Sequence, residues 1–137
     1  MQRRHFLAAS AAFVTAGRAL TANGQTYRRG LVEEELAAGK TVFIDFYTDW
    51  CSTCRAQGKI IRDLMASNPA YEQNITFVKV DWDRHAQSEL ATRLNIPRRS
   101  TLVVLKGDKE LGRIVAGTSR REIQKLMDVA LQAATSA

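Results

Sequence analysis

Apolar residues in this chain form short continuous runs and helical stripes, which together predict an alternating α/β unit. Runs of β-type residues at 41–47 and 75–80 predict two buried strands, and the first is interrupted by a single charge, Asp45. Two further apolar runs, at 101–105 and 111–116, flank a turn-forming Lys-Gly-Asp-Lys segment and predict a hairpin.

Helical periodicity separates these strands. Residues 28–38 begin with acidic side chains that suit a helix start, and residues 86–94 carry a short apolar side. Residues 53–66 carry an inward apolar stripe that ends at an Asn-Pro pair, and Ser119 opens a capping box before the last helix. The expected order is helix, strand, helix, strand, helix, strand, strand, helix.

The length of the chain allows one domain with a substantial core. The sequence has 137 residues, of which 45% are hydrophobic, as is usual for a globular protein. From residue 23 onward we find no internal repeat, low-complexity tract or linker. We therefore expect a single α/β domain over residues 23–137.

Residues 1–22 have the pattern of an export signal. A basic start with Arg3 and Arg4 precedes an apolar stretch that is too short to span a bilayer comfortably, followed by small residues. The Arg-Arg-His-Phe-Leu run resembles the bacterial twin-arginine motif, and an ordinary secretory signal is the alternative. Either signal predicts a bacterial, periplasmic protein, anchored to the membrane if the signal is retained. The cleavage point stays open among three alanines: Ala16, Ala19 and Ala22.

The charge of the chain gives no support to a nucleic-acid-binding function. There are 20 basic and 14 acidic residues, a net charge of +6, but three arginines within the first 22 residues supply half of this excess. The remaining charge is not arranged as a basic stripe with interleaved aromatic side chains. Arginine pairs in the rest of the chain are expected to be solvated surface pairs.

The two cysteines, Cys51 and Cys54, lie where the first buried strand leads into a helix. Residues i and i+3 of a helix share a face, so their sulfurs can form a disulfide without backbone movement. Unpaired N–H groups and the helix dipole favour a nucleophilic thiolate at Cys51. Cys54, one turn later, is placed to attack a mixed disulfide on Cys51 and release the substrate.

Three other uses of the two thiols fit less well. A disulfide across two residues closes too small a loop to restrict the unfolded chain much. Zinc requires four ligands, and beyond the cysteines the chain offers only His5, within the expected signal, and His85. Two unrelated buried thiols would not explain the strand, tryptophan and helix around the motif, so we favour a redox dithiol.

These residues resemble the thioredoxin family over essentially all of residues 25–133. The resemblance rests on four segments: Asp45 with the Trp50-Cys51-x-x-Cys54 motif, Phe77–Asp81, Ile96–Lys106 and Gly117. The Asp-Trp-Cys-x-x-Cys motif especially resembles that of the C-terminal periplasmic domain of the thiol reductase DsbD. The resemblance implies a thioredoxin fold, a central mixed β-sheet flanked by helices with the dithiol at a strand tip. Since no convincing strand precedes the first helix, we expect that sheet edge to be short or missing.

The resemblance also assigns roles to individual residues. Cys51 would be the nucleophile and Cys54 the resolving cysteine. Asp45 stands at the family's buried carboxylate, which moves protons to and from the inner thiol; desolvation would raise its pKa, and an Asp that faces water is the alternative. Lys79 matches the lysine that approaches this carboxylate, although a surface lysine fits equally well. Trp50 would shape the docking surface beside the dithiol.

One departure from the family concerns the cis proline that usually lies opposite the dithiol. If the third strand starts at Thr101, Ser100 occupies this slot, preceded by Arg99; the other alignment keeps Pro97 there and inserts two residues. A cis bond costs more before serine than before proline, so Ser100 is expected to be trans. Arg99 would bring positive charge near Cys51 and favour its thiolate, and an exposed basic loop is the alternative.

The residues between the cysteines, Ser52 and Thr53, also differ from the pairs usual in reducing and oxidising members of the family. Their hydroxyls either donate hydrogen bonds to the Cys51 sulfur or cap the helix, and we expect the cap. The redox potential therefore stays open.

Together these features predict a periplasmic thiol:disulfide oxidoreductase, a monomer that reduces protein disulfides without a metal or any cofactor besides the Cys51–Cys54 disulfide. In an oxidising compartment it needs an electron donor, for which we expect a membrane thiol reductase. An oxidant or isomerase is the alternative within this chemistry. An alternative of another class is a redox-inert or metal-bridged binding module, because loss of the proline removes a steric guard against metals.

Overall fold

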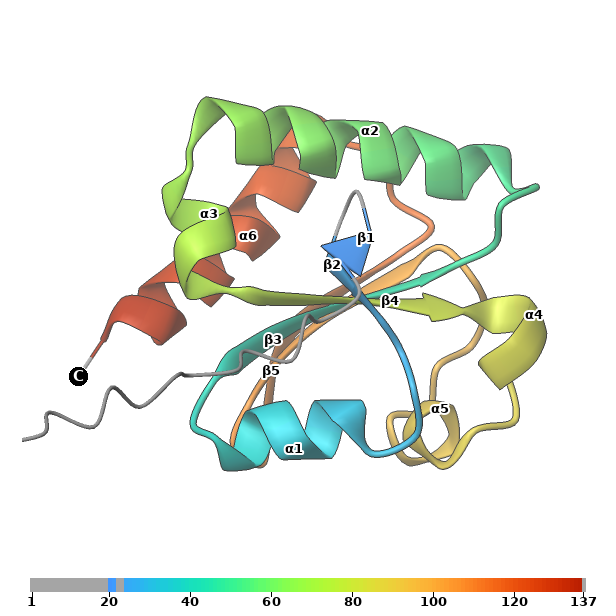
Figure 1. The fold of residues 1–137 in the computed structure, drawn as a ribbon. Coiled ribbons are helices and arrows are strands. Elements are labelled where there is room, and N and C mark those ends of the chain that lie inside the picture. Colours follow the sequence, from blue (N-terminus) through green and yellow to red (C-terminus); the bar gives the residue numbers. More distant parts are fainter. Residues whose placement is uncertain (1–19, 22–23, 137) are drawn as a thin grey trace, which may run out of the picture.

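The computed structural model describes Leu20, Thr21 and residues 24–136. The expected export signal, residues 1–22, therefore lies outside the described residues except for Leu20 and Thr21. Within the described part, helices cover both faces of a central sheet (Figure 1), which confirms the expected α/β architecture.

Six strands of the described residues form one mixed sheet in the order β1-β2-β4-β3-β5-β6. They are β1 (Leu20–Thr21), β2 (Gly24–Thr26), β3 (Thr41–Tyr47), β4 (Thr76–Asp81), β5 (Thr101–Lys106) and β6 (Lys109–Val115). Strands β2, β4 and β3 are parallel to one another, whereas β5 runs antiparallel to β3 and β6 antiparallel to β5. The parallel pair β3 and β4 therefore ends at the edge of the sheet where β5 begins.

The helices pack on the sheet in two layers. They are α1 (Leu31–Ala37), α2 (Ser52–Ser67), α3 (Ala70–Asn74), α4 (Trp82–His85), α5 (Glu89–Arg93) and α6 (Arg120–Thr135). In Figure 1, α2, α3 and α6 lie on one side of the sheet, α1 and α5 lie on the other, and α4 follows the end of β4.

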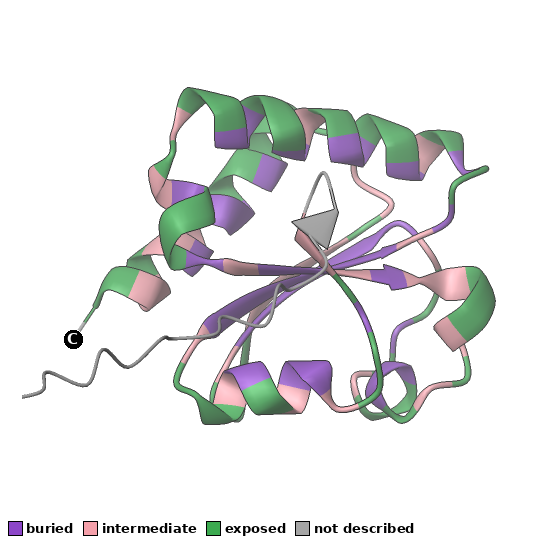
Figure 2. Ribbon diagram, viewed as in Figure 1, coloured by how far each residue is buried: buried purple, intermediate pink, exposed green. Residues whose placement is uncertain are grey.

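The alternation of side chains along β3 explains how the core is divided. Val42, Ile44 and Phe46 belong to the apolar cluster under α1 and α5, whereas Phe43 belongs to the cluster under α2, α3 and α6. Figure 2 shows the buried residues along the strands and on the inward sides of the helices. Asp45 has the same parity as Phe43, so the one charge of this strand points toward α2.

Two expected helices differ from the structure by three residues at their start. The first helix begins three residues later than expected, because Gly30 takes a left-handed φ of 87°. Residues 86–94, expected as one helix, contain only α5, because Ser88 is extended and its side chain accepts a hydrogen bond from the Ala91 N–H as the N-cap. The expected short edge before α1 is confirmed, since β2 has three residues.

No helix among the described residues combines the length and the apolar content that a bilayer crossing requires.

Candidate active site

The dithiol lies at the carboxyl end of β3, where a short turn leads into α2. The Cys51 N–H donates a hydrogen bond to the Thr48 carbonyl at 3.4 Å, and Cys51 is the N-cap of α2 with an extended backbone. Its sulfur accepts a hydrogen bond from the Cys54 N–H at 3.2 Å. The expectation that Ser52 or Thr53 caps the helix is therefore wrong, because the Cys51 sulfur itself occupies that role.

Both thiols are free and almost completely buried. Cys51 is 5% exposed and Cys54 is 4% exposed, so the structure represents the reduced dithiol. They lie one helical turn apart, as the spacing predicts.

Ser100 lies directly against the two sulfurs. Its Oγ is 3.2 Å from the Cys51 Sγ and 3.0 Å from the Cys54 Sγ, and the residue is completely buried. Pro97 is exposed, and no peptide bond among the described residues is cis. The structure thus places Ser100, and not Pro97, opposite the dithiol.

The surroundings of Cys51 favour its thiolate. Burial raises the pKa of the Cys51 thiol, but hydrogen bonds from the Cys54 thiol, the Ser100 hydroxyl and the Cys54 N–H outweigh this effect. The Arg99 guanidinium adds a smaller contribution in the same direction. The net result is a pKa lowered from 9.0 to about 6, so that Cys51 is largely a thiolate at neutral pH.

Cys54 is held in the opposite protonation state. Burial raises the pKa of its thiol, and the hydrogen bond that this thiol donates to Cys51 raises the pKa further. Cys54 is therefore a thiol when Cys51 is a thiolate, and it needs a base before it can act as a nucleophile.

Asp45 is a buried carboxylate that can serve as the base for Cys54. It is 5% exposed, and burial raises its pKa from 3.8 to about 6, although the charge of Lys79 lowers it. Asp45, Lys79 and Cys54 line one hollow of about 300 Å³ beneath α2. Lys79 pairs with Asp45 across β3 and β4, and its ammonium lies 4.0 Å from the centre of the Tyr47 ring.

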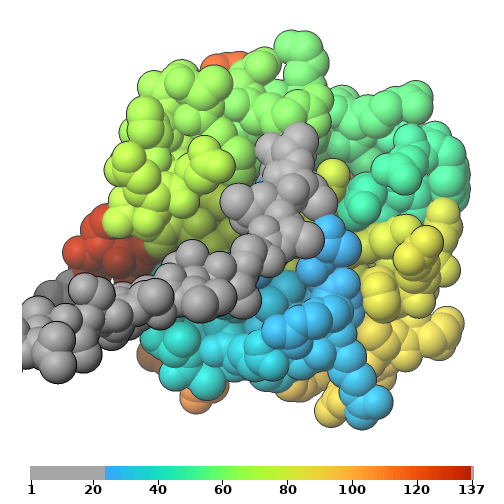
Figure 3. Space-filling model, in the orientation of Figure 1, coloured from blue at the N-terminus to red at the C-terminus, as the bar shows by residue number. Residues whose placement is uncertain are grey.

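Trp50 forms the exposed rim of the site. Its side chain is 59% exposed, and its Nε1 donates a hydrogen bond to the Asp83 carboxylate at 2.8 Å. The Arg99 guanidinium lies 4.2 Å from the centre of the indole ring. Figure 3 shows the residues around 50 and those of α4 as adjoining patches at one end of the molecule. Trp50, with the Arg99 guanidinium over its ring, thus borders Cys51.

Gln57 is a site residue that the sequence interpretation missed. It is completely buried in α2, and its Nε2 donates hydrogen bonds to the carbonyls of Ser100 and Gly117, both at 3.0 Å. These bonds tie the helix to the two loops that enclose the dithiol. The sequence does carry a sign of this role, because Gln57 places an amide on the inward side of α2, where an apolar residue is usual.

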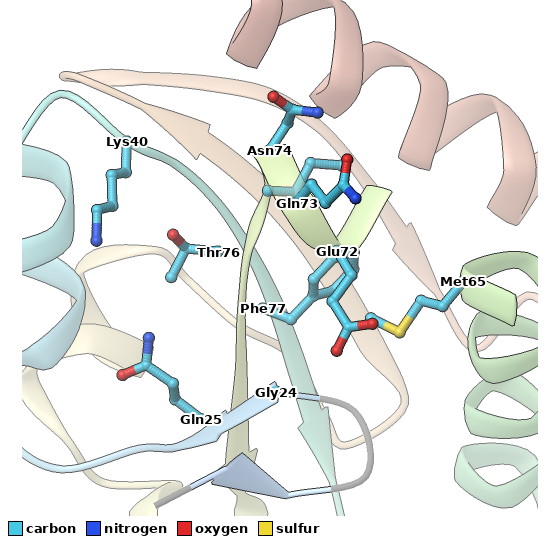
Figure 4. A pocket seen from close by; sticks show the side chains of 10 residues that line it. Gly24, Gln25, Lys40, Met65, Glu72, Gln73, Asn74, Thr76 and Phe77 are labelled. Atoms are coloured by element: carbon cyan, nitrogen blue, oxygen red, sulfur yellow. The ribbon is translucent and has the colours of Figure 1, made fainter. Parts of the chain in front are cut away.

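A separate hollow of about 400 Å³ lies at the other end of the sheet, where β4 begins (Figure 4). Its lining includes Gly24 and Gln25 of β2 and Thr76 and Phe77 of β4, and it contains neither cysteine. The described residues also hold no group of three or more histidine, cysteine or acidic side chains arranged for a metal ion.

Comparison with known proteins gives a consistent set of similarities. A family model described as thioredoxin matches residues 21–129. Thioredoxin H5 of Oryza sativa subsp. japonica is 31% identical over 86 residues, which cover 63% of this chain and 59% of that protein. The chain thus spans about three fifths of the length of this relative.

Solved structures share the architecture. The thioredoxin Mala s 13 of Malassezia sympodialis has a TM-score of 0.67 at 24% identity and covers 80% of this chain and 94% of its own. Trxlp of Edwardsiella tarda has a TM-score of 0.63 at 26% identity and covers 74% of this chain and 95% of its own. The range matched by the family model includes every residue of the site described above.

Proposed function

The chain belongs to the thioredoxin family, and from this premise we propose that it is a thiol:disulfide oxidoreductase that works through Cys51 and Cys54. One observation carries the proposal: two free thiols lie at the tip of β3, and the outer one is held as a thiolate by hydrogen bonds. The proposed chemistry needs only this dithiol and no bound cofactor.

The first step is attack by Cys51. Its thiolate displaces one sulfur of a substrate disulfide, so that a Cys51–substrate disulfide forms and the other substrate sulfur leaves as a thiolate that takes a proton from water. A pKa of about 6 supplies the thiolate at neutral pH.

The second step is resolution by Cys54. Asp45 accepts the proton of the Cys54 thiol, and the new thiolate attacks the Cys51 sulfur and expels the second substrate thiolate. The enzyme disulfide forms while the substrate gains two electrons. A carboxylate with a pKa raised to about 6 suits this proton transfer near neutrality, and the shared hollow brings Asp45 and Cys54 together.

We expect protein disulfides as substrates, because the exposed Trp50, with the half-buried Arg99 against its ring, lies beside a nucleophile that is itself buried. A protein substrate can contact Trp50 while its disulfide reaches Cys51. Ser52, exposed, and Thr53, half-buried, extend the same rim from the first turn of α2.

The direction and place of the reaction rest on the sequence. The resemblance to the DsbD domain favours a reductant, and the pattern of residues 1–22 favours export to a bacterial periplasm, with a membrane thiol reductase as electron donor. A low Cys51 pKa stabilises the reduced form and so pulls the potential upward. Titration against glutathione buffers tests the direction: a reductant stays oxidised in buffers that reduce an oxidant.

Reduction of insulin by dithiothreitol tests the activity. The chain is expected to accelerate the appearance of insulin precipitate, and Cys51→Ser is expected to abolish the acceleration because the nucleophile is lost. Equal rates with and without the wild-type protein would contradict the proposal. Stoichiometric metal in freshly purified protein, together with inert thiols, would favour the metal-bridged binding module.

Cell fractionation tests the location. The full chain expressed in a bacterium is expected in the periplasm, and changing Arg3 and Arg4 to lysine is expected to hold it in the cytoplasm. Export of the lysine variant would identify an ordinary secretory signal instead. Retention of the wild-type chain in the cytoplasm would overturn the periplasmic assignment.

A further inference from the structure

The hydroxyl of Ser100 is within hydrogen-bond distance of both sulfurs. We propose that it is a catalytic hydrogen-bond donor that serves the two thiolates in turn, first Cys51 and then Cys54. The inference rests on the proposed function and names a further residue for that reaction, at the position where the family usually has a proline without a donor.

The geometry brings one hydroxyl to two reacting atoms. The Ser100 Oγ lies 3.2 Å from the Cys51 Sγ and 3.0 Å from the Cys54 Sγ. Ser100 is 0% exposed, so bulk water does not compete for its hydrogen. A serine hydroxyl has one hydrogen on a rotatable bond, so from this position it can donate to either sulfur.

The backbone of Ser100 is held firmly enough to aim this hydroxyl. Its N–H donates to the Phe46 carbonyl at 2.7 Å, and its carbonyl accepts from the Ala116 N–H at 2.8 Å and from the Gln57 amide at 3.0 Å. These bonds come from β3, from the residue after β6 and from α2. The position of the hydroxyl is therefore set by three separate parts of the fold.

The conformation of Ser100 shows that its side chain is kept at a cost. The residue has a φ of 65°, in the left-handed region where glycine is the easier choice. Strained residues of this kind persist where the surroundings hold them, and they cluster at functional sites. A glycine would satisfy the backbone here, so the serine is explained by what its hydroxyl does.

In the resting reduced enzyme the hydrogen bonds run in one direction. The Cys54 thiol and the Ser100 hydroxyl both donate to the Cys51 thiolate. This direction agrees with a Cys51 pKa that is lowered and a Cys54 pKa that is raised. The hydroxyl thus stabilises the first nucleophile.

After the first chemical step, the Ser100 hydroxyl changes its acceptor from Cys51 to Cys54. When the Cys51 thiolate has formed its bond to the substrate sulfur, it carries no charge, and the leaving substrate sulfur takes away an electron pair. Asp45 then accepts the Cys54 proton, and the Ser100 hydroxyl turns its hydrogen toward the new Cys54 thiolate. Cys54 attacks Cys51, the Cys51–substrate bond breaks, and the second substrate thiolate leaves. Rotation about one side-chain bond is the only movement that this exchange requires of Ser100.

The pH dependence of Cys51 alkylation by iodoacetamide tests the first half of the proposal. Ser100→Gly removes the hydroxyl and relieves the left-handed backbone, whereas Ser100→Ala removes the hydroxyl and keeps the strain. Both variants are expected to raise the midpoint by roughly one pH unit, a tenfold loss of thiolate below the midpoint, because one charge-assisted donor is lost while the other donors remain. Asn95→Gly is the matched control, since Asn95 is exposed and also left-handed at a φ of 52°; its midpoint should not move.

The rate at which a preformed mixed disulfide on Cys51 is resolved tests the second half. Loss of the hydroxyl is expected to slow this single-turnover step about tenfold in both Ser100 variants, with no change in Asn95→Gly. The slowing should appear with an insulin disulfide and with a small aromatic disulfide alike, because the hydroxyl acts on Cys54 and not on the substrate.

The outcomes separate a wrong role for Ser100 from a wrong function. Wild-type midpoints and resolution rates in both Ser100 variants would overturn the inference while leaving the oxidoreductase intact. Changes in Ser100→Ala that Ser100→Gly does not share would also overturn it, because they would follow backbone strain and not the hydroxyl. The alkylation midpoint needs no disulfide substrate, so it can be measured even if the wild-type protein fails to reduce insulin.

Discussion

Four buried polar residues belong to the site: Asp45 and Thr48, which line a hollow with Cys54, and Ser100 and Gln57, which are hydrogen-bonded to each other. Burying polar groups in an otherwise apolar core is unfavourable unless each is hydrogen-bonded. Asp45 shows the cost most clearly, since one of its carboxylate oxygens is buried without a hydrogen-bond partner among the described residues. Stability alone would favour apolar residues at these positions. The presence of polar residues there indicates that this part of the fold is adapted to chemistry.

The stability cost of Asp45 should depend on pH. Its folded pKa of about 6 lies above its unfolded value of 3.8. The folded protein therefore keeps its full stability with respect to this group below pH 4, where the carboxyl is protonated, and loses stability as the pH rises through 6. Asp45→Asn is therefore expected to stabilise the reduced protein by roughly 3 kcal/mol at pH 7.5 relative to its effect at pH 3.5. Urea unfolding at both pH values measures this difference.

A matched control for this measurement is Asp108→Asn. Asp108 is exposed in the turn between β5 and β6, so its substitution should shift stability equally at the two pH values. A stabilisation by Asp45→Asn that did not change with pH would show that folding does not raise the pKa of this carboxyl.

The sequence predicted those site residues whose role depends on short spacing. Cys51, Cys54 and Trp50 are neighbours in one segment, and Asp45 stands out as the single charge in an apolar strand. Asp83, which orients the Trp50 indole, lies 33 residues from its partner, and no local pattern reports such a contact. The same limit explains why Gln57 was missed.

Elements with an uninterrupted period were predicted well, and those shaped by one special residue were not. The range predicted for β3 coincides with the structure, because a continuous run of six buried residues marks it. The bounds of α1 depended on the left-handed Gly30, and those of α5 on the cap at Ser88. The five-residue α3 was not foreseen, since a single turn carries too little period to recognise.

Helix α2 is attached to the site by Gln57, which gives a prediction at the scale of the element. Gln57→Met keeps the size of the side chain but removes the hydrogen bonds to the Ser100 and Gly117 carbonyls. We expect a loss of about 1–2 kcal/mol in the free energy of unfolding, because buried hydrogen bonds are lost. We also expect a rise in the Cys51 alkylation midpoint, because Ser100 is less firmly held.

Gln124→Met serves as the control for this substitution. Gln124 is exposed on α6, so the same change of residue type should leave both the unfolding free energy and the alkylation midpoint close to the wild type. If Gln57→Met behaved like Gln124→Met, the attachment of α2 through this amide would be unimportant.

At the scale of the whole molecule, the sheet order assembles the site. Strand β3 lies between β4, which is parallel to it, and β5, which is antiparallel. The segment after β3 with Cys51, the segment after β4 with Asp83 and the segment before β5 with Ser100 therefore meet at one edge of the sheet. The sequence predicted these strands but not their order in the sheet, which depends on contacts between segments far apart in the chain.

The exposed surface around Trp50 gives a prediction about substrate size. Trp50→Ala removes an aromatic side chain that is 59% exposed, so folding should be little affected. Reduction of insulin should fall roughly tenfold, as is usual for loss of an aromatic interface anchor, whereas the reaction with a small aromatic disulfide should change little. Equal losses with both substrates would show that Trp50 acts on Cys51 and not on the docked protein.

The most direct measurement of the central claim is the intact mass of the Cys54→Ser protein after incubation with insulin. Because Cys51 can attack but the adduct cannot be resolved, the account predicts a covalent adduct on Cys51 that dithiothreitol releases. The Cys51→Ser protein treated in the same way should form none. Absence of an adduct on the Cys54→Ser protein, or equal adducts on both, would contradict the account.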